Sequence, residues 1–111
     1  MSRASYSVIE TTINGKDYTL KVSGKSIDKI EKTFGGIMPA MEEISKVNST
    51  TLAQIVAAGA YIGQSGMNDL KEDIRAEGLT NVATVCIDFL GRMMNPSGTD
   101  AEEEGDSEGE D

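Results

Sequence analysis

Apolar and polar residues alternate on both sides of the dipeptide Asn14-Gly15. Both residues tolerate the positive φ angles of a tight type I′ turn, whose twist matches that of the strands it joins. The pattern therefore predicts a β-hairpin over residues 6–22, with one apolar face that needs a cover because a lone hairpin is only marginally stable. The residues that share this face are Ile9, Ile13, Tyr18, Leu20 and Val22, and they share it whether the loop has two residues, 14–15, or four, 14–17.

A short amphipathic helix is predicted directly after the hairpin. Gly24 ends the second strand, and the hydroxyl of Ser26 is placed to cap the helix by accepting a backbone N–H. The double glycine at 35–36 ends the helix, because glycine enters the left-handed conformation at little cost. The apolar stripe that would cover the hairpin consists of Ile27, Ile30 and Phe34.

Four further segments carry apolar residues at the 3.6-residue spacing of a helix. The first spans about residues 38–46. The second, about residues 52–62, follows capping side chains at 48–51 and is predicted to be the central buried helix. Residues 67–77 are predicted to form a surface helix with a narrow apolar stripe. The last helix, capped by Thr80, has the strongest periodicity of the chain and should belong to the core.

These segments predict an α+β fold, mostly α, with an N-terminal β-hairpin packed on a small bundle of four to five helices over residues 26–94. Gly59 and Gly63 lie four residues apart beside small alanines, so another helix can approach them closely. Tight packing within the domain and a contact with another protein both explain this spacing.

Composition divides the chain into a neutral body and an acidic tail. The chain has 111 residues, 38% of them hydrophobic, which is enough for one small globular domain over residues 1–94. Residues 1–94 carry 11 acids and 10 bases, whereas residues 95–111 carry eight acids and no base. The tail cannot bury enough apolar surface to offset the entropy of ordering, so we expect it to be disordered and dispensable for folding.

The residue on which most hydrolytic chemistry depends is missing. The chain contains no histidine, the usual general base and zinc ligand. Its single cysteine, Cys86, lies in an apolar helical stripe, which predicts an unreactive core residue. The carboxylates of the body, including Asp69 and Asp73, are predicted to be solvated ion-pairing groups, and the expected pairs are Glu42 with Lys46 and Glu72 with Arg75. We therefore expect no catalysis, no metal and no cofactor.

Charge and hydropathy also exclude two classes of partner. A near-neutral body with an acidic tail repels phosphate, which argues against nucleic-acid binding. The longest apolar-rich stretch, residues 52–62, is shorter than the roughly 20 residues that span a bilayer. A lone cysteine suits a reducing compartment, so the sequence predicts a cytoplasmic protein without a membrane anchor.

Six methionines are many for so short a chain. Flexible thioethers suit surfaces that accept varied apolar partners, although filling a core is their more frequent use. With several amphipathic helices and few large aromatic residues, we expect one apolar stripe to stay open and to bind a partner. The residues assigned to this partner-binding surface are Met38, Met41, Ile44, Met67, Leu70, Ile74, Met93 and Met94.

The N-terminal third carries a family resemblance. A hairpin with an Asn-Gly tip, a second strand ending in YTLKV at residues 18–22, and a helix reading IDKIEKTFG at residues 27–35 resemble the small tail-assembly-chaperone proteins of long-tailed phages and gene transfer agents. The likeness extends over residues 6–94 in size and helical content. It implies a factor of the host cytoplasm that coats the tape-measure protein during tail assembly, with the tail tube protein as a further partner, and that is absent from the mature virion.

Two other functions fit the same sequence. A small structural virion component, such as a tail or head-tail connector subunit, would share the compact helical body. A small acidic regulator such as an antitoxin would use the tail against a basic partner. The unpaired edges of the hairpin leave open a homo-oligomer formed edge to edge, and the acidic tail would either add solubility to a complex or compete for the binding surface.

Overall fold

The computed structural model describes residues 5–95 and confirms the predicted fold class. A two-stranded antiparallel sheet is followed by five α-helices and one short 3₁₀ turn in this part of the chain. The elements are β1 (Ser5–Ile13), β2 (Lys16–Ser23), α1 (Gly24–Phe34), α2 (Ile37–Ile44), α3 (Ser49–Ala60), η1 (Gln64–Gly66), α4 (Met67–Glu77) and α5 (Leu79–Met94). The disorder predicted for the acidic tail concerns residues that, apart from Asn95, lie outside the described range.

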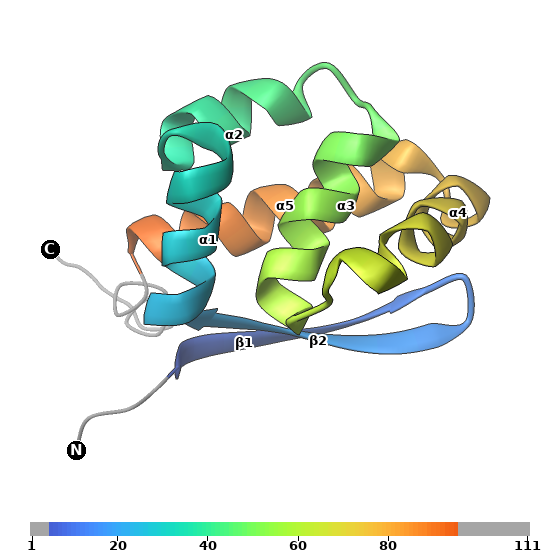
Figure 1. Cartoon of the computed structure of the whole chain (residues 1–111), viewed down its shortest axis with the longest axis horizontal. Helices are drawn as coiled ribbons and strands as arrows, with labels where there is room; N and C mark the ends of the chain where they lie inside the picture. The colour runs from blue at the N-terminus through green and yellow to red at the C-terminus, as the bar shows by residue number, and fades with distance from the viewer. Residues whose placement is uncertain (1–4, 96–111) are drawn as a thin grey trace, which may run out of the picture.

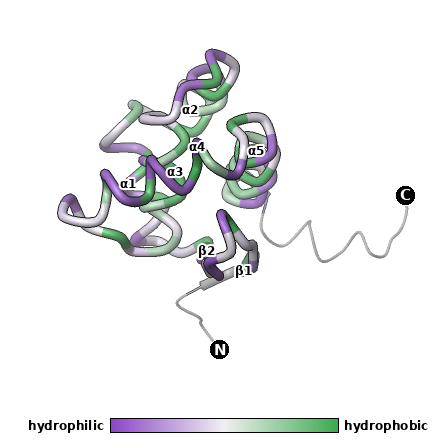
Figure 2. Tube along the Cα trace, turned by 90° about the vertical axis from the view of Figure 1, so that its right-hand side faces the viewer, coloured by the Kyte–Doolittle hydropathy of each residue, from purple (hydrophilic) through white to green (hydrophobic). Residues whose placement is uncertain are grey.

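The hairpin forms a floor beneath the helices. It runs along one side of the molecule, with α1 above its base, α4 above its tip and α3 between them (Figure 1). Figure 2, turned by 90°, shows α1 and α5 on opposite sides of the body, with α2 at the end far from the hairpin. Because the hairpin meets helices along its length, its two ends have different neighbours.

The hairpin adopts the two-residue loop, one of the two registers that the alternation allows. Ile9 lies opposite Leu20, and the last pair before the turn is Ile13 with Lys16, which leaves a two-residue loop. Asn14 and Gly15 have φ angles of 52° and 78°, the positive values that a type I′ turn requires. Four of the five residues assigned to the apolar face are buried and Tyr18 is half-buried, so the cover that the face requires is present.

The start of α1 differs from the prediction. Ser23, not Ser26, is the N-cap, and its hydroxyl accepts a hydrogen bond from the Ser26 backbone N–H at 3.1 Å. The Ser26 hydroxyl in turn accepts from the Ser23 backbone N–H at 2.9 Å, so the two serines cap the helix reciprocally. The helix therefore begins at Gly24 immediately after β2. The predicted end is confirmed, since Gly35 is the C-cap with a φ of 91°.

Two other helix boundaries also need correction. The predicted helix over 38–46 is α2, which spans Ile37–Ile44. Thr80 does not cap α5, because the helix begins at Leu79 and the Thr80 carbonyl accepts a hydrogen bond from the Thr84 hydroxyl. The capping segment predicted before the central helix is confirmed: the side chain of Asn48 accepts from the Thr51 N–H at 3.0 Å.

The core is one cluster centred on α3. It includes buried residues from both strands and all five α-helices. Gly59 faces this core, and a Cβ atom there would lie 2.7 Å from the Phe89 ring and 3.0 Å from Cβ of Leu20. The close approach predicted at Gly59 therefore serves packing inside the body, against both α5 and β2. Gly63 has no neighbouring atom at that distance and takes no part in this contact.

Candidate functional site

The structure separates the eight residues that the sequence assigned to a partner-binding surface. Four of them are buried in the core, namely Ile44, Leu70, Ile74 and Met93. The expectation that these four form an exposed stripe is wrong, because the helices that carry them turn these positions toward α3 and the neighbouring helices.

The other four candidates do not form one surface. Met38 on α2 and Met94 at the end of α5 are 58% and 52% exposed, whereas Met41 and Met67 are half-buried against the core. They belong to three different helices, and of the four only Met67 lines a hollow of the molecular surface. A contiguous binding surface has to be sought elsewhere.

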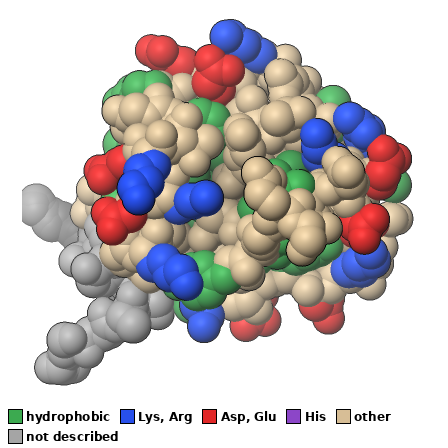
Figure 3. Space-filling model, viewed as in Figure 1, with side chains coloured by type: hydrophobic (Ala, Val, Ile, Leu, Met, Phe, Trp, Pro, Cys, Tyr) green, Lys and Arg blue, Asp and Glu red, His purple; other side chains and the backbone are tan. Residues whose placement is uncertain are grey.

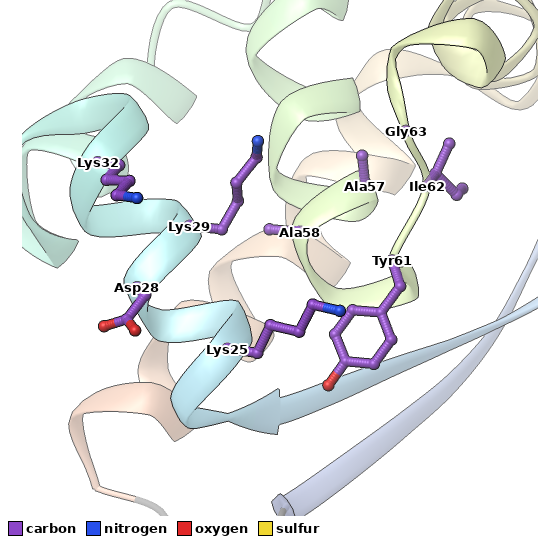
Figure 4. Close-up of a pocket in the computed structure, with 9 residues that line it drawn as sticks. All are labelled: Lys25, Asp28, Lys29, Lys32, Ala57, Ala58, Tyr61, Ile62 and Gly63. Carbon is purple, nitrogen blue, oxygen red and sulfur yellow. The ribbon is translucent and has the colours of Figure 1, made fainter.

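A groove of about 400 Å³ opens between α1 and the C-terminal half of α3. Its floor is apolar, with Ala57 and Ala58 of α3 and Ile62 of the segment that follows (Figure 4). A smaller hollow of about 200 Å³ shares Lys29, Ala57, Ile62 and Gly63 with it and extends it to Met67 at the start of α4. The two hollows, which share these four lining residues, are together called the channel along α3.

Lysines line the α1 side of this groove. Lys25, Lys29 and Lys32 lie at helical spacing on one face of α1, and none of them makes an ion pair with another residue of the range 5–95. Figure 3 shows several basic side chains over α1, with acidic side chains beside them at the outer edge. Asp28 is the single carboxylate among the lining residues, and Figure 4 shows its carboxylate directed away from α3. The groove therefore combines an apolar floor with a net positive rim.

Tyr61 forms the end of the groove nearest the hairpin. It is the C-cap of α3 and has a φ of 60°, in the left-handed region that a residue with a side chain adopts only at some cost. Its hydroxyl lies 2.9 Å from the hydroxyl of Ser23. The ammonium groups of Lys25 and Lys21 lie 4.7 Å and 5.8 Å from the centre of its ring. These contacts hold the ring beside the start of α1.

A polar cluster lies at the opposite end of the hairpin, around Asp73 of α4. Asp73 is only 6% exposed, so its assignment as a solvated carboxylate is wrong. Its Oδ1 atom accepts a hydrogen bond from the Asn14 side-chain amide at 3.0 Å. Its Oδ2 atom accepts a hydrogen bond from the Tyr18 hydroxyl at 3.2 Å and forms an ion pair with Lys16 Nζ at 2.9 Å. The Asn14 backbone N–H donates to the carboxylate of Glu77 at 2.7 Å. The turn is thereby bound to α4.

The protonation states of this cluster follow from these contacts. Hydrogen bonds from Asn14 and Lys16 hold the pKa of Asp73 below its usual value, because they favour the carboxylate. The hydrogen bond and the charge of Asp73 raise the pKa of Lys16. Burial, reinforced by the bond to Asp73, raises the pKa of Tyr18. All three groups are thus held in the form that binds the hairpin tip at neutral pH.

The ion pairs on the surface are partly the predicted ones. Glu72 pairs with Arg75 at 2.6 Å, as expected, but Lys46 pairs with Glu43 at 3.0 Å and not with Glu42. Burial raises the pKa of the Cys86 thiol to about 12, which confirms its expected place in the core and keeps the thiolate scarce at neutral pH. Among residues 5–95, no group of three or more acidic, cysteine or histidine side chains is placed to hold a metal ion.

No protein-family model matches the chain, and neither the curated proteins nor the solved structures searched gave a match. None of the helices described is both long and apolar enough to cross a membrane.

Sequence reasoning missed the residues that line the groove. The spacing of Lys25, Lys29 and Lys32 was a usable signal, since residues at i, i+4 and i+7 share one face of a helix. The interpretation of this helix used only its apolar face. The place of Tyr61 carried no local signal, because it depends on the packing of α3 beside the end of the hairpin.

Proposed function

We propose that this protein is a non-catalytic tail assembly chaperone that binds helical segments of the tape-measure protein in the host cytoplasm. The N-terminal resemblance supports this proposal, and the elements that carry it occur in the expected order, a hairpin with a two-residue turn followed by a helix that ends on Gly35. The tail tube protein would be a second partner, and the chaperone would leave before the virion is complete.

The observation that carries the proposal is the channel along α3. Small floor residues, Ala57, Ala58 and Gly63, let a partner backbone come close, and Ile62 and Met67 supply apolar contact area. A helix laid in such a channel would bury its apolar face there. The lysines on α1 would select segments that carry carboxylates beside that face. Binding of this kind needs no reactive group.

Co-expression with a tape-measure protein, followed by affinity capture, tests the proposal. We expect co-purification of the wild-type chain, and a loss of at least about tenfold in recovered partner with Lys25→Glu/Lys29→Glu, which reverses the charge of the rim. The matched control is Lys46→Glu/Lys71→Glu, which makes the same change of net charge on residues that do not line the groove. Equal capture by both variants would refute the groove as the binding site.

A structural virion component remains the second candidate because the sheet has only two strands in the described part, which leaves outer edges to pair with another copy. Arg92 donates to the Val8 carbonyl at 3.3 Å and so occupies part of the outer edge of β1. Within the described residues, no third strand pairs with the outer edge of β2. Mass spectrometry of purified particles separates the two functions. A structural subunit would be stoichiometric with the other tail proteins, whereas a chaperone would be nearly absent.

A further inference from the structure

The lysines without a carboxylate partner are concentrated at one place. Within residues 5–95, the lysines that form no ion pair are Lys21, Lys25, Lys29, Lys32 and Lys71. The first four lie near the groove, on α1 or beside the ring of Tyr61, and only Lys71 lies on another helix. Asp28 offsets one of these charges, so the rim keeps a net positive charge.

The complementary charge is present in the same chain. Residues 100–111 contain eight carboxylates and no basic residue. The described body is close to neutral, so no other segment offers a comparable density of acids. The chain therefore carries both a positive groove and a negative peptide that matches it.

The length of the C-terminal segment allows it to reach the groove. Sixteen residues follow Asn95 and extend up to about 50 Å at roughly 3.3 Å per residue. The body is 25 Å across its two shorter axes. Figure 1 shows α5 ending at the same end of the molecule as the start of α1, and Figure 2 shows the two helices on opposite sides of the body, so the segment has one width to cross.

We infer that residues 100–111 bind to the lysine rim of the groove in the same molecule and compete there with the partner segment. Each exposed ion pair contributes little, but a tether of this length keeps the acidic peptide at an effective concentration in the millimolar range. The contact is electrostatic and exposed, so salt weakens it. The inference relies on the proposed function only for the identity of the competitor.

Paramagnetic broadening in the full-length protein tests the contact directly. Ser107→Cys carries a nitroxide, and Cys86 stays unlabelled because it is buried with a pKa raised to about 12. We expect amide signals of residues 25–32 and 57–63 to lose intensity selectively, and to recover in 0.5 M NaCl. Uniform weak broadening over the body, or broadening centred on Lys71, would overturn the inference.

Two controls assign the contact to the groove and to one molecule. Lys25→Gln/Lys29→Gln should abolish the selective broadening, whereas Lys46→Gln/Lys71→Gln, with the same net charge, should leave it unchanged. Equal loss in both variants would mean a general charge effect and would overturn the inference. A mixture of unlabelled ¹⁵N protein with spin-labelled ¹⁴N protein should show no broadening, since broadening there would assign the contact to a second copy.

Competition is measured with a labelled tape-measure segment that wild-type protein binds. Replacing the eight acids of residues 100–111 with Asn and Gln should tighten binding about three- to tenfold. When the acidic peptide occupies the groove, only the molecules with an open groove bind the partner, so the apparent affinity is reduced in proportion to that open fraction. Unchanged affinity would refute the competition while leaving the proposed function intact. If neither chain binds any segment, the proposed function fails, and the spin-label result still decides whether the groove binds the acidic peptide.

Discussion

At the tip of the hairpin, Asp73 of α4 receives hydrogen bonds from Asn14 and Tyr18 and pairs with Lys16, whereas at the base the lysines of α1 face a groove without a carboxylate partner in the described residues. Both regions join the hairpin to a helix and both contain lysines. At the tip the carboxylate is buried and the donors surround it, so the charges hold the fold together. At the base the cations stand over an apolar floor and are available to an incoming ligand.

The contrast shows how charge divides between stability and binding. A buried carboxylate that lost its donors would destabilise the fold, because its desolvation would no longer be compensated. An exposed lysine without a partner contributes little to folding stability, and its ammonium group is available to pair with another molecule. Substitutions at the tip should therefore change stability, and substitutions at the rim should change binding.

The largest expected effect comes from Asp73→Ala. It removes the acceptor for Asn14, Tyr18 and Lys16 together, and we expect the melting temperature to fall by about 10 °C. Asp69→Ala on the exposed face of the same helix is the control and should shift it by no more than about 2 °C. Circular dichroism measures both. Similar losses in the two variants would mean that the cluster around Asp73 has no special weight.

Two glycines compare the packed side of α3 with the open segment that follows it. Gly59→Ala places a Cβ atom 2.7 Å from the Phe89 ring, and we expect a net loss of about 1–2 kcal/mol, since overpacking exceeds the gain in helix propensity. Gly63→Ala points into open space and should be neutral or stabilising by about 0.5 kcal/mol. Urea unfolding compares the two variants. A neutral Gly59→Ala would show that Phe89 moves aside freely.

Low pH should remove the stabilising effect of the Asp73 carboxylate at the hairpin tip. Because the pKa of Asp73 is depressed in the folded protein, its stabilising effect is present above the ordinary aspartate pKa of about 3.9 and is lost as the pH falls through the lower folded value. We expect the difference in melting temperature between the wild type and Asp73→Asn to be constant from pH 5 to 8 and to shrink below pH 4. A difference that persists at pH 2 would mean that the charged form does not hold the turn.

The smallest effects belong to the groove. Lys25→Gln/Lys29→Gln/Lys32→Gln should change the free energy of unfolding by no more than about 0.5 kcal/mol, because no folded contact depends on those charges apart from one exposed lysine over the ring of Tyr61. Tyr61→Phe keeps the ring and loses the bond to Ser23, at a cost of about 0.5–1.5 kcal/mol. Denaturant titration measures both. A loss above 2 kcal/mol in the triple variant would assign these lysines to the fold.

The fold was largely predictable because its signals are local. The Asn14-Gly15 turn and the alternation around it determine the register, and Gly35 marks the end of α1. The error at the start of that helix is also local, since Ser23 and Ser26 cap it together and the sequence does not show which of them is the N-cap.

The candidate site was less predictable because it depends on long-range packing. Met38 and Met93 look alike in the sequence, yet the first is exposed and the second buried, since burial depends on which helix lies opposite. Asp73 receives donors that are 55 and 59 residues away, so no local pattern distinguishes it from Asp69. The lysine face of α1 was visible, but only the position of α3 makes it the rim of a groove.

The turn of the hairpin is also a site of slow chemical degradation. Asparagine is a thermolabile residue, and the backbone nitrogen of the glycine that follows Asn14 can attack its side-chain amide, which releases ammonia and forms a cyclic imide that hydrolyses to an acid. At Asn14 this reaction would replace a donor 3.0 Å from the Asp73 carboxylate with a second negative charge. Deamidated molecules would therefore lose the contact between the hairpin tip and α4 first, and a mass increase of about one dalton in the peptide that contains Asn14 would identify them.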